Sequence, residues 1–305
     1  MTRCPGRSEV YIFSLLPQIR VKKKRKEKIL RKIKLYTILV LELFILSLLL
    51  QKLDKQNVEF VEASSQVVTK PPVMKPNYEY PIFIYHYVEY VTDERDTIRK
   101  SLNTPPYVLE SQIKTLKDAG YVFITPSEIG KIANGRLQIP GKPIILSFDD
   151  GYEDFYTDVF PILKENQVKA IVYIVPGFLD HLNHMYSWQL EEIAKSDLVE
   201  IGAHTMHHAY LSKMNGNFAK YEIEQSKKEL EEELKKPVVS FAYPYGAYSE
   251  QTIELVQSSG FTNAVSAEEG TNENLQEIYH LNRIHPGHRV GQSLIEAIEQ
   301  VDSIL

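Results

Sequence analysis

Short apolar runs alternate with amphipathic stretches along the chain from Tyr80 onward. Six runs rich in β-branched and aromatic residues are predicted strands: 81–87, 143–148, 170–175, 199–202, 238–242 and 263–266. Apolar residues recur at helical spacing in the stretches between and after them: 108–119, 127–133, 154–166, 188–194, 218–235 and 249–258. Strands and helices in this order form a parallel sheet with crossover helices, so we expect an α/β domain over residues 80–305, most simply a barrel.

The N-terminal part has a different pattern. Residues 1–34 hold twelve Lys and Arg against two Glu, and residues 35–50 are apolar except for Glu42 and a few small polar groups. A basic segment before an apolar one indicates a cytoplasmic end followed by a signal-anchor, which we place at residues 35–52. No small-x-small cleavage site lies close to the apolar run, so we favour an anchor over a cleaved signal peptide. A basic patch that binds RNA or directs nuclear import, followed by a buried helix, is the alternative.

Residues 53–79 contain Pro71, Pro72 and Pro76 with little apolar periodicity, which predicts a stalk. The chain would then be a single-pass protein of the cell membrane with its folded domain outside the cytoplasm, or a secreted protein if the signal is cleaved. We expect a monomer.

Composition narrows the partners and the metal chemistry. The 305 residues are 43% hydrophobic and 25% charged, which is typical of a globular protein. Beyond residue 34 there are 23 Lys and Arg against 38 Asp and Glu, so nucleic acid is not an expected partner of the domain. The single cysteine, Cys4, excludes an intrachain disulfide and a cysteine-based zinc ribbon. Any metal would therefore be held by histidines and carboxylates.

Two adjacent carboxylates, Asp149 and Asp150, follow the apolar run 144–148 and precede Gly151. Active sites of α/β proteins lie at the carboxyl ends of parallel strands, where these two side chains would be found. A turn in which an aspartate caps a helix is the structural alternative.

A histidine cluster follows the predicted strand 199–202. His204 and His208 are four residues apart, so one helical turn would bring both to one side of a metal. One carboxylate and two imidazoles leave a position open for water, as in catalytic zinc sites, and cobalt or nickel would also fit. An incidental surface cluster is the alternative.

Two weaker signals accompany these motifs. The predicted strand 238–242 runs into a tight turn, Tyr243 to Gly246, that could direct a backbone N–H into the site as an oxyanion donor. Such turns more often only pack. Trp188, the single tryptophan, precedes the histidine strand and would either line a sugar site or belong to the core.

The segments 147–151, 204–208 and 243–246, in this order, resemble the motifs of the polysaccharide deacetylases, the NodB-like carbohydrate esterases. The resemblance covers residues 80–290 and implies a deformed (β/α) barrel that removes acetyl groups from polymeric sugars with the help of a divalent metal. It implies the following roles: Asp149 as general base, Asp150, His204 and His208 as metal ligands, and the Tyr245 backbone N–H as oxyanion donor. The candidate substrate-binding residues are Trp188, Tyr243, Pro244, Arg283 and His285.

The chain departs from the family pattern in two places. Phe241 stands where many members have an arginine, and the late segment contains Arg283 and His285 instead of a Leu-x-His motif. The early strand with His86 is similar to that of the poly-β-1,6-N-acetylglucosamine deacetylases, whose circularly permuted motifs place the acid first. We therefore favour His86 over His285 as general acid, and infer that Arg283 orients Asp149.

The expected function is metal-dependent deacetylation of N-acetylglucosamine residues in a cell-surface or extracellular polysaccharide. Three alternatives stay open. A glycoside hydrolase also uses paired carboxylates but needs no histidines at this spacing, and an inactive polysaccharide-binding protein could keep the fold. A metal-dependent phosphoesterase is disfavoured, because no basic cluster surrounds the motifs.

Overall fold

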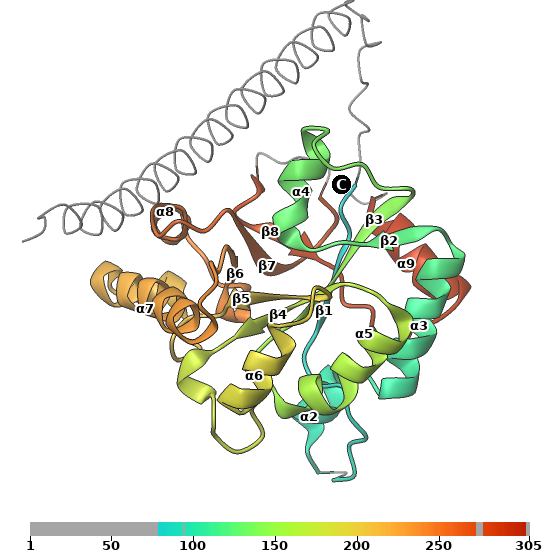
Figure 1. The fold of residues 1–305 in the computed structure, drawn as a ribbon, viewed down its shortest axis with the longest axis horizontal. Coiled ribbons are helices and arrows are strands. Elements are labelled where there is room, and N and C mark those ends of the chain that lie inside the picture. Colours follow the sequence, from blue (N-terminus) through green and yellow to red (C-terminus); the bar gives the residue numbers. More distant parts are fainter. Residues whose placement is uncertain (1–78, 94, 273–276, 303–305) are drawn as a thin grey trace, which may run out of the picture. The chain divides into compact units, whose positions relative to one another are not determined.

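The computed structural model describes residues 79–93, 95–272 and 277–302 (Figure 1). The predicted basic segment 1–34, the anchor 35–52 and all of the stalk except Glu79 lie outside these residues. Among the helices that are described, none combines the length and the apolar character that crossing a bilayer requires. The anchor therefore stays a prediction.

The described strands form one parallel sheet that curves into a nearly closed barrel (Figure 1). Their order is β1, β3, β4, β5, β6, β7, β8, with β2 paired to β3. A parallel bridge between Phe83 and Ile284 joins β1 to the end of β8 and narrows the gap. The strands are β1 (Ile82–Tyr85), β2 (Tyr121–Phe123), β3 (Lys142–Phe148), β4 (Ala170–Ile174), β5 (Val199–Ala203), β6 (Ser240–Ala242), β7 (Asn263–Glu269) and β8 (Leu281–Arg283). The predicted parallel α/β barrel is confirmed.

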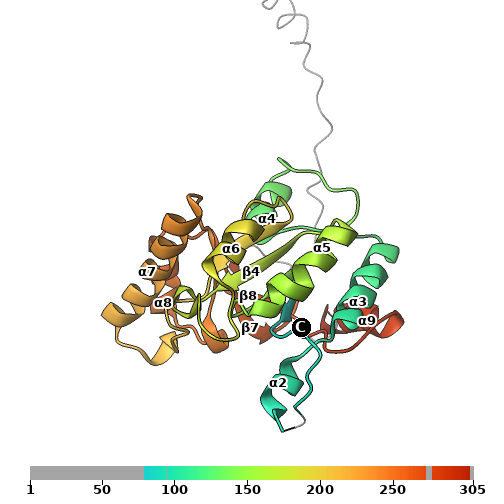
Figure 2. The ribbon, with the colours of Figure 1, turned by 60° about the horizontal axis from the view of Figure 1, so that its bottom comes forward.

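Helices surround the strands, as Figures 1 and 2 show from two sides. They are α2 (Thr97–Leu102), α3 (Pro106–Asp118), α4 (Pro126–Ala133), α5 (Phe160–Asn166), α6 (Ser187–Ile193), α7 (Gly216–Leu234), α8 (Glu250–Ser258) and α9 (Gln292–Asp302). Helices α3 and α9, far apart in sequence, lie side by side. The Gln112 side chain of α3 donates to the carbonyls of Gly287 and Arg289 just before α9.

Strand residues alternate between two apolar clusters on opposite faces. Ile144, Leu146 and Phe148 belong to the larger cluster, which also contains core residues of α3 and α7. Ile145 belongs to a smaller cluster with residues of β1, β4, β7 and β8, which therefore fills the barrel interior. The residues at positions 147 and 149 continue the inward-facing series, so this alternation directs Asp149 toward the barrel interior.

Local signals begin the helices at the expected places. Thr125 and Glu128 form a capping box at α4, and Ser249 and Thr252 form the equivalent pair at α8. The side chain of Asn215 caps α7 by accepting the N–H of Asn217. The observed bounds of the predicted helices agree with the sequence pattern to within two residues, except in one segment.

That segment is the predicted helix 154–166, which is divided in two. Residues Phe155–Val159 form a π-helical turn and only Phe160–Asn166 are α-helical. Two strands and two α-helices of the described chain were not predicted: β2, β8, α2 and α9. The two strands have only three residues each, which is too short for a periodicity, and no residue of α2 is buried.

Candidate active site

Asp149 lies at the end of β3, where it is held by a buried arginine from β8. The Arg283 guanidinium donates to both carboxylate oxygens of Asp149 over 2.7 Å each. It also donates to the Ser147 hydroxyl at 3.2 Å and to the Ser266 carbonyl at 2.5 Å. Arg283 is only 1% exposed. A planar guanidinium in this bidentate contact leaves the carboxylate little freedom to turn.

The charges around Asp149 keep it ionised. Burial by itself would raise the pKa of this carboxyl, but Arg283 and the nearby His204 outweigh burial, and the pKa is lowered. An ionised carboxylate at the carboxyl end of a barrel strand is able to accept a proton from water.

The next residue, Asp150, forms a separate cluster with His204 and His208. One potential ligand atom from each of these residues lies within 4.8 Å of the others. The Asp150 Oδ1 atom is 3.1 Å from Nε2 of His208 and 3.5 Å from Nε2 of His204. This oxygen is buried and has no hydrogen-bond partner among the described residues. A buried carboxylate oxygen that faces two imidazole nitrogens is suited to a divalent cation.

Backbone strain and charge support this arrangement. Asp150 has a φ of 73°, in the left-handed region that aspartate enters at a cost. Burial would raise the pKa of Asp150, but the two histidines outweigh it and the pKa is lowered. The carboxylate is therefore in the ionised form that a metal ligand requires.

A backbone carbonyl of β6 fixes the orientation of the His204 ring. Its Nδ1 lies 2.8 Å from the Ala242 carbonyl, which can only accept, so Nδ1 carries the proton and Nε2 is the free lone pair. Burial lowers the pKa of His204 against the opposing effect of Asp149 and Asp150. A neutral imidazole in a fixed orientation is the form that binds a metal.

The histidines do not lie on a helical turn, and that prediction is wrong. Strand β5 ends at Ala203, and the following residues form a turn in which Thr205 and His208 have φ values of 58° and 56°. The buried Thr205 side chain accepts the N–H of Ala209 at 2.9 Å. Two left-handed residues, rather than helical periodicity, bring His208 beside His204.

The two candidate acids differ in their surroundings. His86 follows β1, is half-buried, and is close enough to Asp149, Asp150 and Arg283 for their charges to act on it. Burial lowers the pKa of His86, while the two aspartates oppose this effect. His285 is exposed, and its Nδ1 lies 2.9 Å from Oε2 of Glu269.

The 243–246 turn divides into a buried part and an exposed part. Tyr245 has a φ of 60°, is 65% exposed, and places its ring 4.6 Å from that of His208 and 5.6 Å from that of Tyr210. Tyr243 is fully buried between Phe241 and its other aromatic neighbours. Tyr243 and Pro244 are both buried, so their side chains offer no exposed surface to a sugar, which differs from the prediction.

Trp188 lies at the start of α6 and is 57% exposed, so it is not a core residue. Its ring packs edge-on against Tyr156 at 5.3 Å. The indole is available to a ligand.

Sequence reasoning missed a tyrosine beside Asp150. The hydroxyl of Tyr87 donates to that of Tyr152 over 2.7 Å, and the two rings stack at 4.1 Å. Burial raises the pKa of Tyr152, and the Asp150 carboxylate raises it further. The place of Tyr152, directly after Gly151, was the one signal that could have indicated it.

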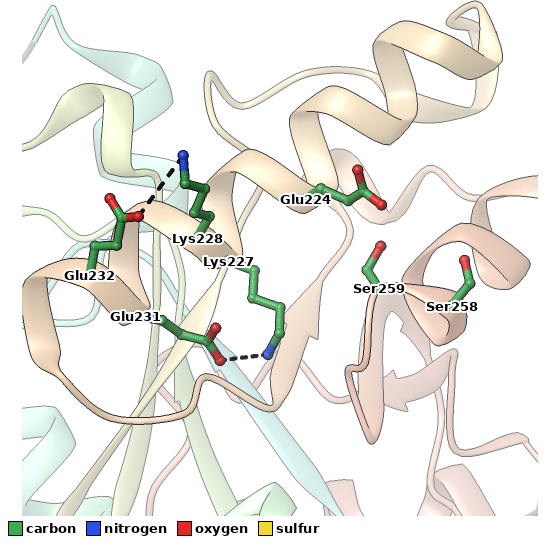
Figure 3. Close-up of a pocket in the computed structure, with 7 residues that line it drawn as sticks. All are labelled: Glu224, Lys227, Lys228, Glu231, Glu232, Ser258 and Ser259. Carbon is green, nitrogen blue, oxygen red and sulfur yellow. Dashed lines mark hydrogen bonds and ion pairs between the residues drawn. The ribbon is translucent and has the colours of Figure 1, made fainter.

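A pocket between α7 and α8, shown in Figure 3, is lined by Lys, Glu and Ser side chains. Lys227 pairs with Glu231 at 2.8 Å, and Lys228 pairs with Glu232 at 3.9 Å. Its lining residues include none of the proposed metal ligands. We interpret it as a solvated helix surface, as the charge pattern of residues 218–235 indicates.

Comparison with known proteins agrees with this geometry. Residues 137–264 match the polysaccharide deacetylase family. The chain is 25% identical over 227 residues to the poly-beta-1,6-N-acetyl-D-glucosamine N-deacetylase of Staphylococcus aureus (strain MRSA252), covering 70% of this chain and 76% of that protein. It is 27% identical over 223 residues to YxkH of Bacillus subtilis (strain 168), whose name assigns it provisionally to the polysaccharide deacetylases; this covers 73% and 75% of the two chains.

A solved structure has the same fold. The Streptococcus pyogenes deacetylase PplD, determined in complex with acetate, superimposes with a TM-score of 0.67 at 26% sequence identity. The match covers 72% of this chain and 98% of that one. The family match at residues 137–264 includes β3 and β5, the strands that precede the candidate site residues.

Proposed function

The chain carries a polysaccharide deacetylase domain, and from this premise we propose that it hydrolyses the acetamido groups of N-acetylglucosamine residues in an extracytoplasmic polysaccharide. The single observation that carries the proposal is the contrast between two consecutive carboxylates. Asp149 is locked to Arg283, whereas Asp150 offers an unpartnered oxygen beside His204 and His208. One is arranged to accept a proton and the other to hold a cation.

Asp150, His204 and His208 would hold a divalent cation, for which zinc is the expected identity and cobalt or nickel would also suit. When bound, such an ion polarises the amide carbonyl and lowers the pKa of water. The protein residues perform the remaining tasks. Asp149 accepts a proton from the attacking water, and Arg283 holds its carboxylate in one orientation.

His86 donates a proton to the leaving amine in this proposal, and acetate departs. Burial lowers the pKa of His86, so the protonated ring is a stronger acid than an exposed imidazolium and transfers its proton more readily. The Tyr245 backbone N–H donates to the developing oxyanion. The outward position of His285 and its contact with Glu269 favour His86 for this role.

A sugar polymer suits the surroundings of the site. The exposed rings of Tyr245 and Tyr210, which lie beside His208, offer apolar surface to pyranose rings. We propose the exposed Trp188 as a further contact for the polymer. The staphylococcal relative is named for poly-β-1,6-linked N-acetylglucosamine and the streptococcal structure contains acetate, which support an acetylated glucosamine polymer and the release of acetate.

A glycoside hydrolase fits the site less well. That chemistry needs one carboxyl group to be protonated while the other is ionised. The pKa values of Asp149 and Asp150 are both lowered, so neither carboxyl is suited to the role of acid.

We also propose that residues 35–52 anchor the protein in the membrane with the barrel outside the cytoplasm. The basic residues of segment 1–34 and the apolar run that follows support this topology. Protease added to intact cells would digest the barrel if the topology is right. A barrel that the protease digests only after the cells are lysed would contradict this topology.

The test of function is acetate release by the full-length protein in detergent from acetylated glucosamine oligomers with β-1,4 or β-1,6 linkages. We expect release that a chelator abolishes and added zinc restores, with the preferred linkage identifying the polymer. Cleavage of the oligomer backbone without acetate would favour a glycoside hydrolase. A metal-loaded protein that binds the oligomers without releasing acetate would be a polysaccharide-binding protein.

A further inference from the structure

We propose that Glu222 of α7 is a positioning residue that holds the metal-binding turn and determines which histidines of the 204–208 segment face the metal. The proposal rests on the proposed function, since it concerns the same centre. It assigns a role to two residues that the mechanism leaves unused, Glu222 and His207.

Three hydrogen bonds join Glu222 to the turn. Its side chain accepts the backbone N–H of His207 at 2.8 Å, and its other carboxylate oxygen lies 2.9 Å from Nδ1 of the same residue. Its backbone carbonyl accepts the N–H of Met206 at 3.0 Å. One residue of α7 therefore contacts both residues that directly precede the ligand His208.

The position of Glu222 on its helix is unusual for a carboxylate. The buried residues of α7 are Ala219, Glu222, Ile223, Ser226 and Leu230, which form a single stripe at helical spacing. The Glu222 side chain is only 10% exposed. A buried acidic group must be hydrogen-bonded to be tolerated, and its partners here are those of the metal-binding turn.

A second segment, after β4, also contacts the turn. Gly177, just after β4, donates its N–H to the Met206 carbonyl at 3.0 Å. A Cβ atom at position 177 would lie 2.5 Å from that carbonyl oxygen and 3.0 Å from the His207 ring. The turn is therefore held by hydrogen bonds to both Gly177 and Glu222, and its backbone approaches Gly177 too closely for a larger residue there.

This confinement matters because the turn is strained. Thr205 and His208 both have left-handed backbone conformations, which residues other than glycine adopt at a cost in free energy. Such conformations persist only where the surrounding contacts impose them. Without Glu222 the turn would relax, and the Nε2 atom of His208 would lose its fixed place beside Asp150.

Glu222 also removes His207 from competition. The sequence offers three histidines within five residues, at positions 204, 207 and 208. The carboxylate holds His207 by its ring and its backbone, with the side chain 53% exposed. The cluster within 4.8 Å contains only His204 and His208 of the three.

The test is zinc affinity, measured by calorimetric titration of the metal-free full-length protein. Glu222→Ala should weaken zinc binding about 10- to 100-fold, the usual effect of removing a group that orients a ligand. Glu222→Gln keeps an oxygen that accepts the His207 N–H and should lose less than about tenfold. Glu224→Ala is the matched control: it is on the same helix, its only ion pair within the described part of the chain is with the surface residue Lys220, and it is labelled in Figure 3.

His207→Ala provides a test that does not depend on the buried carboxylate, because its side chain is half exposed. It removes the ring contact but keeps the backbone N–H bond, so we expect a loss of zinc affinity between those of the Gln and Ala variants. Native zinc affinity in His207→Ala and Glu222→Ala, whatever their melting temperatures, would overturn the proposal. If Glu222→Ala does not fold, native affinity in both His207→Ala and Glu222→Gln would do the same.

Acetate release separates this proposal from the function itself. At saturating zinc, Glu222→Ala should recover kcat with an unchanged KM, because the residue acts through the metal-binding turn. Zinc binding that depends on Glu222 in a protein with no deacetylase activity would leave the positioning role intact and contradict the proposed function.

Discussion

The two halves of the candidate site differ in whether their carboxylate has a hydrogen-bond partner. In the base half, Arg283 donates two 2.7 Å hydrogen bonds to the carboxylate of Asp149 inside the barrel. In the metal half, Asp150 has a buried oxygen without a hydrogen-bond partner in the described part of the chain, and this oxygen lies 3.1 Å and 3.5 Å from the Nε2 atoms of His208 and His204. Of these two consecutive carboxylates, Asp149 is paired with a cation of the protein, whereas Asp150 is arranged to receive one from outside.

This difference teaches where each half obtains its stability. A buried ion pair is complete once the barrel is folded, so the base half needs nothing from outside. A cluster of unpartnered ligand atoms is completed by a bound cation, which then adds its binding free energy to folding. The variants below change one half and ask whether the other responds.

The largest effects on turnover are expected from the reacting groups. Asp149→Asn should lower kcat by about 10³-fold, in the usual range for removing a general base, while zinc stays bound. His204→Ala should lose zinc and activity together. Acetate release and zinc content, measured on the same samples, check both statements. Equal loss of zinc in the two variants would contradict the division of the site into halves.

Removing the partner of the base should be the next largest effect. Arg283→Met would leave Asp149 buried and unpaired, at a cost of about 3–5 kcal/mol in the free energy of unfolding. Zinc affinity should change little, because Arg283 contacts none of the three proposed ligands. Urea unfolding of the metal-free protein gives the stability, and Arg136→Met, an exposed arginine bonded to Asn134, is the control. A stable variant with weakened zinc binding would mean that the halves are not separate.

The acid can be assigned by comparing the two histidines of the late and early strands. His86→Ala should lower kcat about 10²-fold, whereas His285→Ala should stay within about threefold of the native enzyme. Both should keep native zinc affinity, as judged by titration. The reverse order of the two kcat losses would move the acid to His285.

A further carboxylate, Asp154, lies just before the π-helical turn and allows a comparison with Asp149 and Asp150. Its substitution is expected to change stability alone. Asp154 is buried and has no ion pair with a Lys, Arg or His among the described residues, and burial raises its pKa to about 7. The folded protein therefore holds this proton more tightly than the unfolded chain, and stability falls as pH rises from about 4 to about 7. Asp154→Asn should flatten this fall, by up to about 4 kcal/mol for a shift of about three pH units.

Melting curves of the native protein and of Asp154→Asn between pH 4.5 and 8.5 provide the measurement. The Asn variant keeps an acceptor for the Val88 N–H, which Asp154 receives at 2.6 Å. It should melt at a similar temperature at low pH and at a higher temperature above pH 7. Parallel curves for the two proteins would show that Asp154 does not hold a proton near neutral pH.

Much of the fold was predictable because most strands of the barrel contain a short run of apolar residues, as β1, β3 and β4 do. Strand β3 has only buried residues after Lys142, and the Asp149-Asp150 pair at its end marks the site. The strands β2 and β8 were not predictable, since three residues show no period. Their positions depend on pairing with distant strands, which the local pattern does not contain.

The grouping of Asp150, His204 and His208 was predictable, because each residue lies just after a strand end and the structure brings one potential ligand atom of each within 4.8 Å of the others; their roles stay a prediction. The route by which His208 reaches the cluster was not, because two non-glycine residues adopt left-handed conformations that only tertiary contacts impose. Glu222 escaped notice for the same reason: its burial depends on the packing of α7.

The bridge between Phe83 and Ile284 has a consequence for the order of events during refolding. The metal half is built on β3 and β5, which are separated in the sheet by β4 alone. Arg283, in contrast, is separated from its partner Asp149 by 134 residues of sequence. Contacts of long sequence separation form late, because the loop they close is costly in entropy. A refolding chain should therefore regain zinc binding before turnover, and the lag between the two would time the closure of the barrel.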